Sequence, residues 1–199
     1  MSENTDQQQA GVRLTREQRT KLVLDTAEQL FYARGIRAVG MDELVRVTGL
    51  SKMSVYRLFP TKDDLVGAYL RRTSAAVLDM IDAAVMAHSA DPRAALRAMF
   101  DLVEHDTGRP DFRGAAFQNA SVEFHEYDHP ARIATRAHEQ AVYQRLLALT
   151  ERLWPQQGAQ RAAWLHLLIT GMYGDAAILG ARGPAAHGRA LADRLIDSL

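Results

Sequence analysis

The stretch MDELVRVTGLSKMSVYRLF, residues 41–59, decides the fold. It predicts two short helices joined by Gly49-Leu50-Ser51, because glycine permits a positive φ at a helix end and serine caps the next helix. On the second helix, Val55, Leu58 and Phe59 have the i, i+3, i+4 spacing of a buried stripe. Two short helices joined by a turn containing glycine are typical of a helix-turn-helix, a known DNA-binding unit.

The opposite face of the second helix is polar and basic. It carries one cation on each of two successive turns, with a hydroxyl, a phenol and a thioether between them, so it can reach phosphates and base edges together. A short amphipathic helix after a glycine turn is also common in helical bundles, and spacing alone favours DNA binding only weakly. The residues of this face are Lys52, Met53, Ser54, Tyr56 and Arg57.

Charge is distributed unevenly along the chain, although the formal net charge is zero. Between Arg13 and Lys62 there are ten basic and five acidic residues, so the rest of the chain carries the compensating negative charge. Such asymmetry is typical of a chain of which one part meets phosphate. An ordinary solvated helical surface explains the same charges, so the asymmetry does not decide between the two interpretations.

Nearly the whole chain predicts helix, because Ala, Leu and Arg dominate and the alternating pattern of strands is absent. Thr15 with Gln18, and Thr61 with Asp64, have the spacing of capping boxes. Prolines fall in the first turn of three later helices, where a missing N–H costs nothing. The predicted helices are Arg16–Ala33, Met41–Thr48, 52–59, Lys62–Thr73, Ser74–His88, Pro92–Thr107, Arg113–His125, Pro130–Trp154, Ala159–Arg182 and Pro184–Ser198.

Composition argues against several classes of protein. Without cysteine, the chain has no disulfide and no Cys-ligated metal. Residues 1–12 are polar and Gln-rich, so we expect no signal peptide. No apolar run approaches the roughly 20 residues that cross a bilayer, so we expect a soluble, cytoplasmic protein with no membrane partner. A G-x-S-x-G motif, a phosphate loop and a dinucleotide fingerprint are missing, so we expect neither enzyme activity nor a cofactor.

One motif points to different chemistry. His125-Glu126-Tyr127-Asp128-His129 matches the H-E-x-x-H of zinc proteases, which need both histidines one turn apart on a continuous helix. Pro130 follows directly and disfavours helix at His129. We therefore interpret the segment as a helix cap and loop, with no metal. A structural or sensory metal held by His125 and His129 stays an alternative.

A longer pattern surrounds the opening stretch. It consists of Ala27 and Phe31-x-x-x-Gly35, Met41-x-x-Leu44, Gly49-Leu50-Ser51-Lys52 and Val55-Tyr56-x-x-Phe59-Pro60-x-Lys62-x-x-Leu65. With these residues, the segment 19–66 resembles the DNA-binding domain of the TetR family of regulators. The Tyr–Phe–Lys run is much more specific than a bare helix-turn-helix. The resemblance implies base contacts from Lys52, Met53 and Ser54, and DNA-backbone contacts from Tyr56, Arg57 and Lys62.

Two positions depart from the pattern of the family. Gly40 stands where the family usually has a Ser or Thr that caps the helix and touches phosphate, although glycine is itself a tolerable cap. Met53 stands where a small residue is usual, and its thioether can pack on a thymine methyl. We count Gly40 and Met41 in the DNA interface with a weakened phosphate contact, and expect Met53 to alter operator preference.

A symmetric dimer reads two half-sites, so an interface is expected after residue 66. The best candidates are the long helices at about 130–153 and 159–182. The second is apolar nearly all round, which favours burial against its own core and against a twin, and the resemblance implies a four-helix bundle between subunits. The candidate interface residues are Tyr143, Leu147, Trp164, Leu168, Gly171 and Met172.

The resemblance also implies an effector pocket among the middle helices, at about 74–127. Aromatic residues there could line the pocket and polar residues could orient a ligand, although plain core aromatics produce the same pattern. The candidate pocket residues are Phe100, Phe117, Asn119, Glu123, Phe124 and His138.

Together these patterns predict an all-α protein with an N-terminal three-helix helix-turn-helix domain and a larger helical ligand-binding and dimerisation domain. The expected boundaries are a disordered tail at 1–14, the DNA-binding domain at 15–62 and the effector domain at 63–199. The predicted function is a ligand-responsive repressor that binds a palindromic double-stranded DNA operator as a homodimer and is released by an unknown small molecule. The alternatives are a metal-sensing regulator and a helical enzyme with a structural helix-turn-helix.

Overall fold

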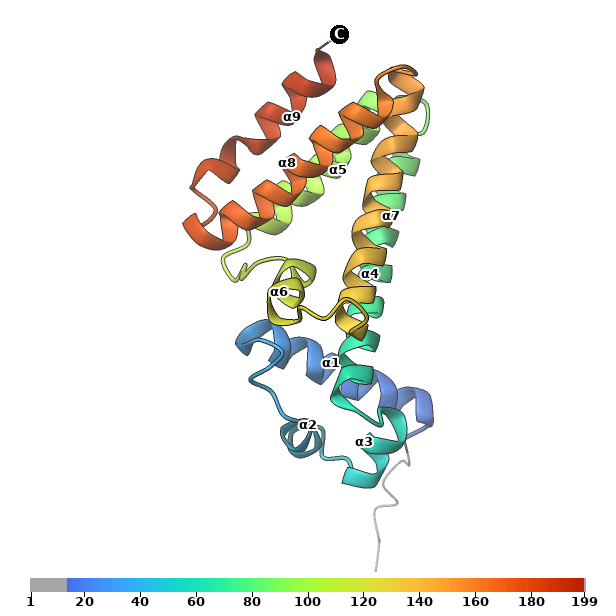
Figure 1. Cartoon of the computed structure of the whole chain (residues 1–199), viewed down its shortest axis with the longest axis vertical. Helices are drawn as coiled ribbons and strands as arrows, with labels where there is room; N and C mark the ends of the chain where they lie inside the picture. Colours follow the sequence, from blue (N-terminus) through green and yellow to red (C-terminus); the bar gives the residue numbers. More distant parts are fainter. Residues whose placement is uncertain (1–13, 199) are drawn as a thin grey trace, which may run out of the picture.

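The computed structural model describes residues 14–198, which form helices and no strand (Figure 1). The all-α prediction is therefore confirmed for this range, while Arg13 and nearly all of the predicted tail lie outside the described residues. The elements are α1 Arg16–Arg34, α2 Met41–Thr48, α3 Lys52–Leu58, α4 Lys62–Ala87, α5 Pro92–Thr107, α6 Ala116–Glu123, α7 Pro130–Leu153, α8 Gly158–Leu179, the 3₁₀ turn η1 Pro184–His187 and α9 Gly188–Asp197.

Helices α1 to α3 form one end of the molecule, at the bottom of Figure 1. Val23 and Phe31 of α1, Leu44 of α2 and Val55 of α3 share one apolar cluster. The predicted stripe on α3 is confirmed, because Val55 and Phe59 are buried and Leu58 packs against the same cluster. The cluster continues into the start of α4, α6 and the start of α7, so the helix-turn-helix shares its core with the rest of the chain.

The caps that the sequence predicts around this unit are confirmed. Both capping boxes form, at Thr15 and at Thr61, each with its side-chain partner three residues later. The Ser51 hydroxyl accepts the backbone N–H of Ser54 at 3.2 Å, which satisfies a donor at the start of α3. Gly49 has φ +68°, the left-handed conformation that ends α2 and turns the chain into α3. The turn between the two helices is thus built as the sequence indicates.

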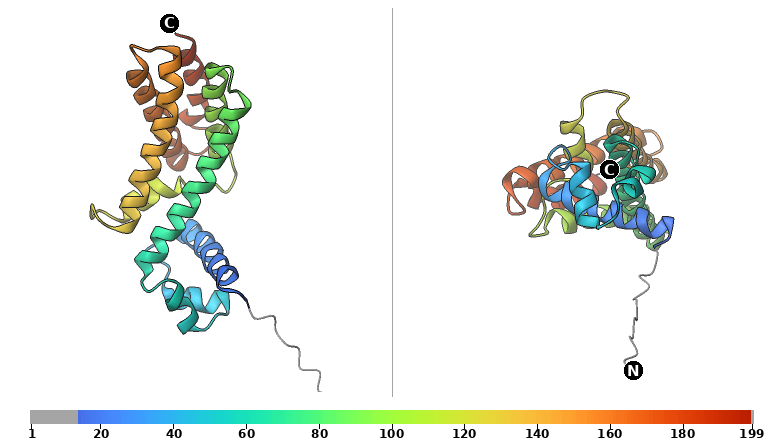
Figure 2. Two further views of the ribbon diagram at one scale, coloured as in Figure 1. Left: turned by 90° about the vertical axis from the view of Figure 1, so that its right-hand side faces the viewer. Right: turned by 90° about the horizontal axis from the view of Figure 1, so that it is seen from below.

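Helix α4 corrects the predicted break between Thr73 and Ser74, since a single helix runs from Lys62 to Ala87 (Figure 2). Hydroxyl residues weaken helices when their side chains compete for backbone hydrogen bonds. The Ser74 hydroxyl instead shares a hydrogen bond with the ring of His138 on α7, 3.0 Å away. The Ser74 hydroxyl therefore bonds to a neighbouring helix and does not compete for the backbone hydrogen bonds of α4. Helix α4 continues through both parts of the molecule.

A second apolar cluster holds the opposite end together. It joins the distal part of α4 to α5, α7, α8 and α9, with α7 and α8 in front and α4 and α5 behind them in Figure 1. Helices α7 and α8 are consecutive and pack against each other. The largest fully buried side chains of this cluster are Leu96, Met99, Phe100, Leu146, Leu165 and Ile196.

Helix α6 is shorter than the predicted helix at Arg113–His125, because its ends take other conformations. Gly114 has φ +97°, and a Cβ there would lie 2.9 Å from the Oδ1 of Asn119. The Asn119 side chain folds back to donate to the carbonyl of Arg113 at 3.1 Å, which fixes this turn. Within α6 only Phe117 and Ala120 are buried. The helix is therefore held by few core contacts.

Helix α8 corrects the expectation that no segment is long enough to cross a membrane. Its 22 residues are long enough and apolar enough to cross a membrane, but length and composition alone are weak evidence of a membrane span. In the structure α8 packs along α7 and against α5 and η1. One of its faces is core, with Leu165 and Ile169 buried, whereas Leu167 and Ile178 on another face are exposed.

Candidate nucleic-acid interface and cavities

The outer face of α3 presents four of the predicted DNA-contact residues to solvent. Met53 is 65% exposed, and Lys52, Tyr56 and Arg57 are exposed as well. Their neighbours Val55 and Phe59 are buried in the core, so one face of the helix is packed against the protein and its polar face is exposed to solvent. An α-helix presented in this way fits the width of the major groove.

The Lys52 ammonium is held by neighbours that DNA can replace. Its Nζ lies 2.8 Å from the Asp42 carboxylate and 5.7 Å from the centre of the Tyr56 ring. The hydrogen bond and charge of Asp42 raise the pKa of Lys52, so the ammonium stays charged. Both side chains of the pair are exposed, and exposed pairs are weak because water screens them. A phosphate is a stronger partner for the same cation.

The other four predicted DNA contacts have partners or positions within the protein. Ser54 shares a hydrogen bond with the Ser51 hydroxyl at 2.8 Å. Lys62 is half-buried and donates to the carbonyl of Arg37 at 3.2 Å, and desolvation lowers the pKa of Lys62. Gly40 caps α2 without a side chain, and Met41 packs against the first apolar cluster.

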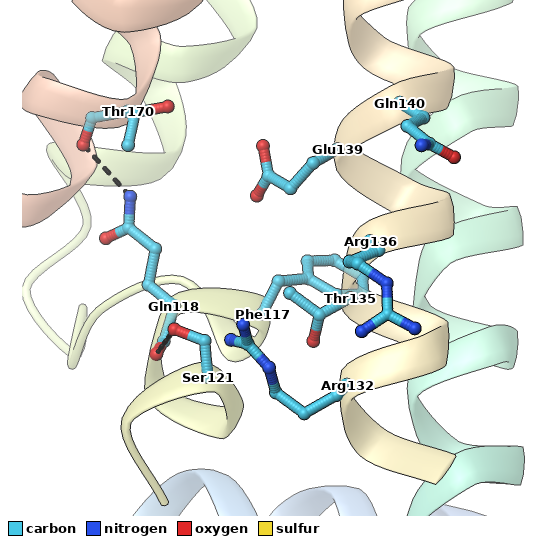
Figure 3. Close-up of a pocket in the computed structure, with 9 residues that line it drawn as sticks. All are labelled: Phe117, Gln118, Ser121, Arg132, Thr135, Arg136, Glu139, Gln140 and Thr170. Carbon is cyan, nitrogen blue, oxygen red and sulfur yellow. Dashed lines mark hydrogen bonds between the residues drawn. The ribbon is translucent and has the colours of Figure 1, made fainter. Parts of the chain in front are cut away.

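A first cavity of about 350 Å³ lies between α6, α7 and α8 (Figure 3). Phe117 is the only predicted pocket residue on its wall. The nine lining residues come from three helices, and most of them are polar. They are Phe117, Gln118 and Ser121 of α6, Arg132, Thr135, Arg136, Glu139 and Gln140 of α7, and Thr170 of α8.

His138 lies behind Phe117. The two rings are stacked with their centroids 3.6 Å apart. Burial lowers the pKa of His138 to about 4, so the imidazole is neutral at pH 7. His138 therefore supports the ring that lines the cavity, and ties α7 to Ser74 of α4.

A second cavity of about 400 Å³ lies against a different face of α6, next to α1. The predicted pocket residues Asn119 and Glu123 line this one. The Glu123 carboxylate accepts two backbone N–H groups of the loop between α1 and α2, from Ile36 at 2.9 Å and from Arg37 at 2.6 Å. Helix α6 thus touches the first cavity with one face and holds the helix-turn-helix with another.

The remaining predicted pocket residues lie elsewhere. Phe100 is fully buried in the second cluster. Phe124 is buried in the first cluster and stacks on His129, with centroids 4.1 Å apart. Neither lines a cavity described above. The six candidates are therefore not brought together into one pocket.

His129 is a helix cap, as interpreted from the sequence. Its Nδ1 accepts the backbone N–H of Ala131 at 3.1 Å, in the first turn of α7, and its Nε2 lies 3.4 Å from Asp63. Between residues 14 and 198, no three His, Asp or Glu side chains gather as metal ligands do. Within the segment 125–129, His129 caps α7, whereas the four residues before it are exposed.

The predicted dimer residues divide between surface and core. Trp164 is 44% exposed, and a Cβ at Gly171 would meet open space. Met172 is buried and packs so closely on Gly188 that a side chain there would overlap it. Met172 therefore belongs to the core of its own protomer. The other three residues are half-buried beside the second cluster: Tyr143, Leu147 and Leu168.

Sequence reasoning missed the charged wall of the first cavity. Arg132, Arg136 and Glu139 have i, i+4, i+7 spacing and therefore share one face of α7. That pattern is also typical of a solvated helix surface. Only the packing of α6 and α8 across this face converts it into a cavity wall.

Comparisons with known proteins agree with this architecture. The family model of the bacterial regulatory proteins of the tetR family matches residues 23–69. A crystal structure of a TetR-family transcriptional regulator from Streptomyces coelicolor has a TM-score of 0.80 and 27% identity, covering 89% of this chain and 95% of that chain. The chain belongs to the TetR family.

Two further proteins resemble this TetR-family chain. The HTH-type transcriptional activator FasR of Mycolicibacterium smegmatis is 32% identical over 136 residues, which cover 67% of this chain and 61% of FasR. The chain thus matches less than two thirds of the length of that relative. The multidrug binding protein EbrR, solved in complex with malachite green, shares the fold at 17% identity and a TM-score of 0.70, covering 90% of this chain and 99% of that one.

Proposed function

We propose that this chain is a cytoplasmic, homodimeric transcriptional regulator that binds an operator in double-stranded DNA and leaves it when a small molecule binds. The observation that carries the proposal is the free outer face of α3, with Lys52, Met53, Tyr56 and Arg57 exposed on a helix anchored from behind. Side chains at the start of such a helix reach base edges, while its basic side chains meet phosphates.

Two exposed, uncharged faces support a dimer. On α8, Leu167 is 68% exposed and Ile178 is 82% exposed, on the same side as Trp164. On α7, Ile133 is exposed, and the same face continues through residues without charge. Large apolar side chains gathered on one surface are typical of an interaction site. The exposed positions of the α7 face are Ile133, Ala137, Gln140, Gln144 and Ala148.

Helix α6 supplies a route from effector to DNA. Gln118 and Ser121 line the first cavity, and two turns or less along the same helix Glu123 holds the loop between α1 and α2. A ligand that moves α6 therefore moves the contact with the helix-turn-helix. Effector binding shifts the population only if the ligand prefers one of the two arrangements. EbrR, named a multidrug binding protein, supports a small molecule as that ligand.

A regulator bound at an operator that overlaps a promoter blocks transcription, and its release by an effector restores transcription. We therefore propose that the protein is a repressor. FasR is named an activator, so the direction of regulation is tested separately. Deleting the gene raises transcription of the target if the protein represses it and lowers transcription if it activates. A lowered transcript would overturn the repressor part and leave DNA binding standing.

DNA binding itself is tested by fluorescence anisotropy with the DNA upstream of the protein's own gene. We expect saturable binding that prefers this DNA to a scrambled sequence and weakens as salt rises. The double variant K52A/R57A is the matched loss-of-contact control, since both side chains are exposed and add little to the fold. Equal affinity for both sequences, or an unchanged affinity in the double variant, would contradict the proposal.

A further inference from the structure

The first cavity contains buried donors that its own protomer leaves unsatisfied. Within residues 14–198, Thr135 Oγ1 and Arg132 Nε are both buried and have no hydrogen-bond partner. Thr135 is only 6% exposed, and both residues line the cavity. Buried polar groups in folded proteins nearly always have a partner, so an orphaned pair beside a cavity indicates a bound group.

The charges around the cavity indicate whether that bound group is an anion or a cation. Arg136 is already engaged, because its guanidinium lies 3.8 Å from the centre of the Tyr127 ring and donates to the Tyr127 carbonyl at 2.7 Å. Glu139, the one carboxylate among the lining residues, is hydrogen-bonded to His166 at 3.0 Å. Neither Arg132 nor Arg136 has an ion-pair partner among the described residues, and Arg132 is the one whose guanidinium also has a buried donor, Nε, without a hydrogen-bond partner.

The arrangement of these groups separates a polar end from the rest of the cavity. Figure 3 shows the Arg132 guanidinium beside Ser121 and Phe117, whereas Glu139 lies farther along α7. The Gln118 amide is occupied, since it donates to the Thr170 carbonyl at 2.9 Å. The Ser121 hydroxyl donates to the Gln118 carbonyl at 2.8 Å. The free donors are thus concentrated on α7, at Arg132 and Thr135.

We propose that this cavity binds a small organic monocarboxylate, whose oxygens accept hydrogen bonds from Arg132 and from the Thr135 hydroxyl. This inference rests on the proposed function, because it names the chemical class of the effector. A guanidinium is suited to a carboxylate in charge and in geometry. A cavity of about 350 Å³ is at the small end of the range for ligand sites, so the apolar body of the ligand is compact.

Other ligand classes fit less well. An uncharged ligand leaves the charge of Arg132 unmatched, and a cation is repelled by both arginines of the wall. A phosphate monoester carries nearly two negative charges at pH 7, and the free guanidinium of Arg132 matches only one of them. The one arginine of the wall whose guanidinium is not already engaged therefore favours a monoanion.

The test measures binding to the full-length protein by calorimetry and by thermal shift, using benzoate, phenylacetate and hexanoate as probes. Each probe is compared with its neutral amide. We expect at least one carboxylate to bind and raise the melting temperature, and its amide to bind at least tenfold more weakly. If the amides bind as well as the acids, or no carboxylate binds, the proposal is overturned.

Two variants test the donor at position 132. Arg132→Gln is expected to weaken the best carboxylate at least tenfold, and Arg132→Lys, which keeps the charge but not the planar donor group, to weaken it less. Arg194→Gln on α9 removes an exposed arginine outside the cavity and is expected to leave affinity unchanged. Circular dichroism verifies the fold of each variant. If neither Arg132→Gln nor Arg132→Lys weakens carboxylate binding, Arg132 is not the donor that binds the carboxylate.

Two further measurements separate this inference from the proposed function. Anisotropy of the same preparation on its DNA reports DNA binding with and without the carboxylate. Loss of DNA binding on adding carboxylate supports both proposals, whereas carboxylate binding without any DNA binding overturns only the proposed function. If Arg132→Gln instead shifts the monomer–dimer equilibrium and no carboxylate binds, the partner of Arg132 is the second subunit and the inference is overturned.

Discussion

At the scale of single residues, the proposed complex predicts how steeply DNA affinity falls as the salt concentration rises. Arg57 is exposed on the face that the proposed complex turns to DNA. Each phosphate contact adds about 0.9 to the slope of log affinity against log salt concentration. We therefore expect Arg57→Ala to lower DNA affinity and to reduce that slope by about one. Anisotropy titrations at several salt concentrations measure it, with Arg194→Gln as control; an unchanged slope would show that Arg57 makes no phosphate contact.

Another residue, His138, links stability to pH. Burial lowers its pKa to about 4, whereas an unfolded histidine titrates near 6.5. Between these values the unfolded chain binds more protons, so stability falls as pH falls and the loss is complete below about pH 4. We expect this group to lower the free energy of unfolding by about 2 kcal/mol between pH 7.5 and pH 5.

Urea denaturation at the two pH values measures this effect. The variant His138→Gln lacks the titrating group and is expected to lose about 2 kcal/mol less than the wild type over the same range. Glu139, Arg145 and His166 also influence the histidine, so the comparison uses the difference between the two proteins. Equal pH dependence in both would show that His138 does not carry the effect.

At the scale of elements, α6 connects the cavity to the helix-turn-helix through one carboxylate. Glu123→Gln weakens two charge-assisted hydrogen bonds to the loop between α1 and α2. We expect a stability loss of about 1 kcal/mol, little change in DNA affinity without effector, and a reduced effector-induced release. Denaturation and anisotropy measure the three quantities, with the exposed Glu104→Gln on α5 as control. Full release in Glu123→Gln would remove α6 as the route.

Element positions could be predicted from the sequence wherever the signal was local. The starts of α1, α3 and α4 follow from Thr15, Ser51 and Thr61, because a cap depends on residues within one turn. The predicted break at Thr73 and Ser74 was wrong because the partner of the Ser74 hydroxyl, His138, is 64 residues away. A hydrogen-bond partner so distant in the sequence cannot be predicted from local sequence patterns.

The candidate site shows the same division. The outer face of α3 could be predicted from helical spacing and from the family resemblance, since both depend on one short segment. The first cavity could not, because its wall combines α6, α7 and α8. Glu123 is predicted as a polar residue that orients a ligand, yet its carboxylate binds the backbone of Ile36 and Arg37, in another part of the chain.

For the molecule as a whole, the proposed dimer depends on the exposed apolar face of α8. Leu167→Glu places a charge where the proposed partner packs, and because Leu167 is exposed the protomer should keep its fold. We expect the variant to become monomeric and to lose at least tenfold in operator affinity, since a monomer reads one half-site. Sedimentation velocity and anisotropy measure both. Met86→Glu on α4 is the control, as another exposed apolar residue; a dimeric Leu167→Glu would place the interface elsewhere.

The unbroken course of α4 has a geometric consequence. Leu65 lies in the first apolar cluster and Ile81 in the second, so one rigid rod is anchored in both ends of the protomer. Its 26 residues span about 39 Å. A tilt of about 5° over that length displaces the far end by about 3 Å, close to the rise of one base pair. In the proposed dimer the α4 helices of the two subunits can tilt in opposite directions. A small shift beside the cavity then changes the separation of the two α3 helices by about two base pairs, so that they no longer match the operator.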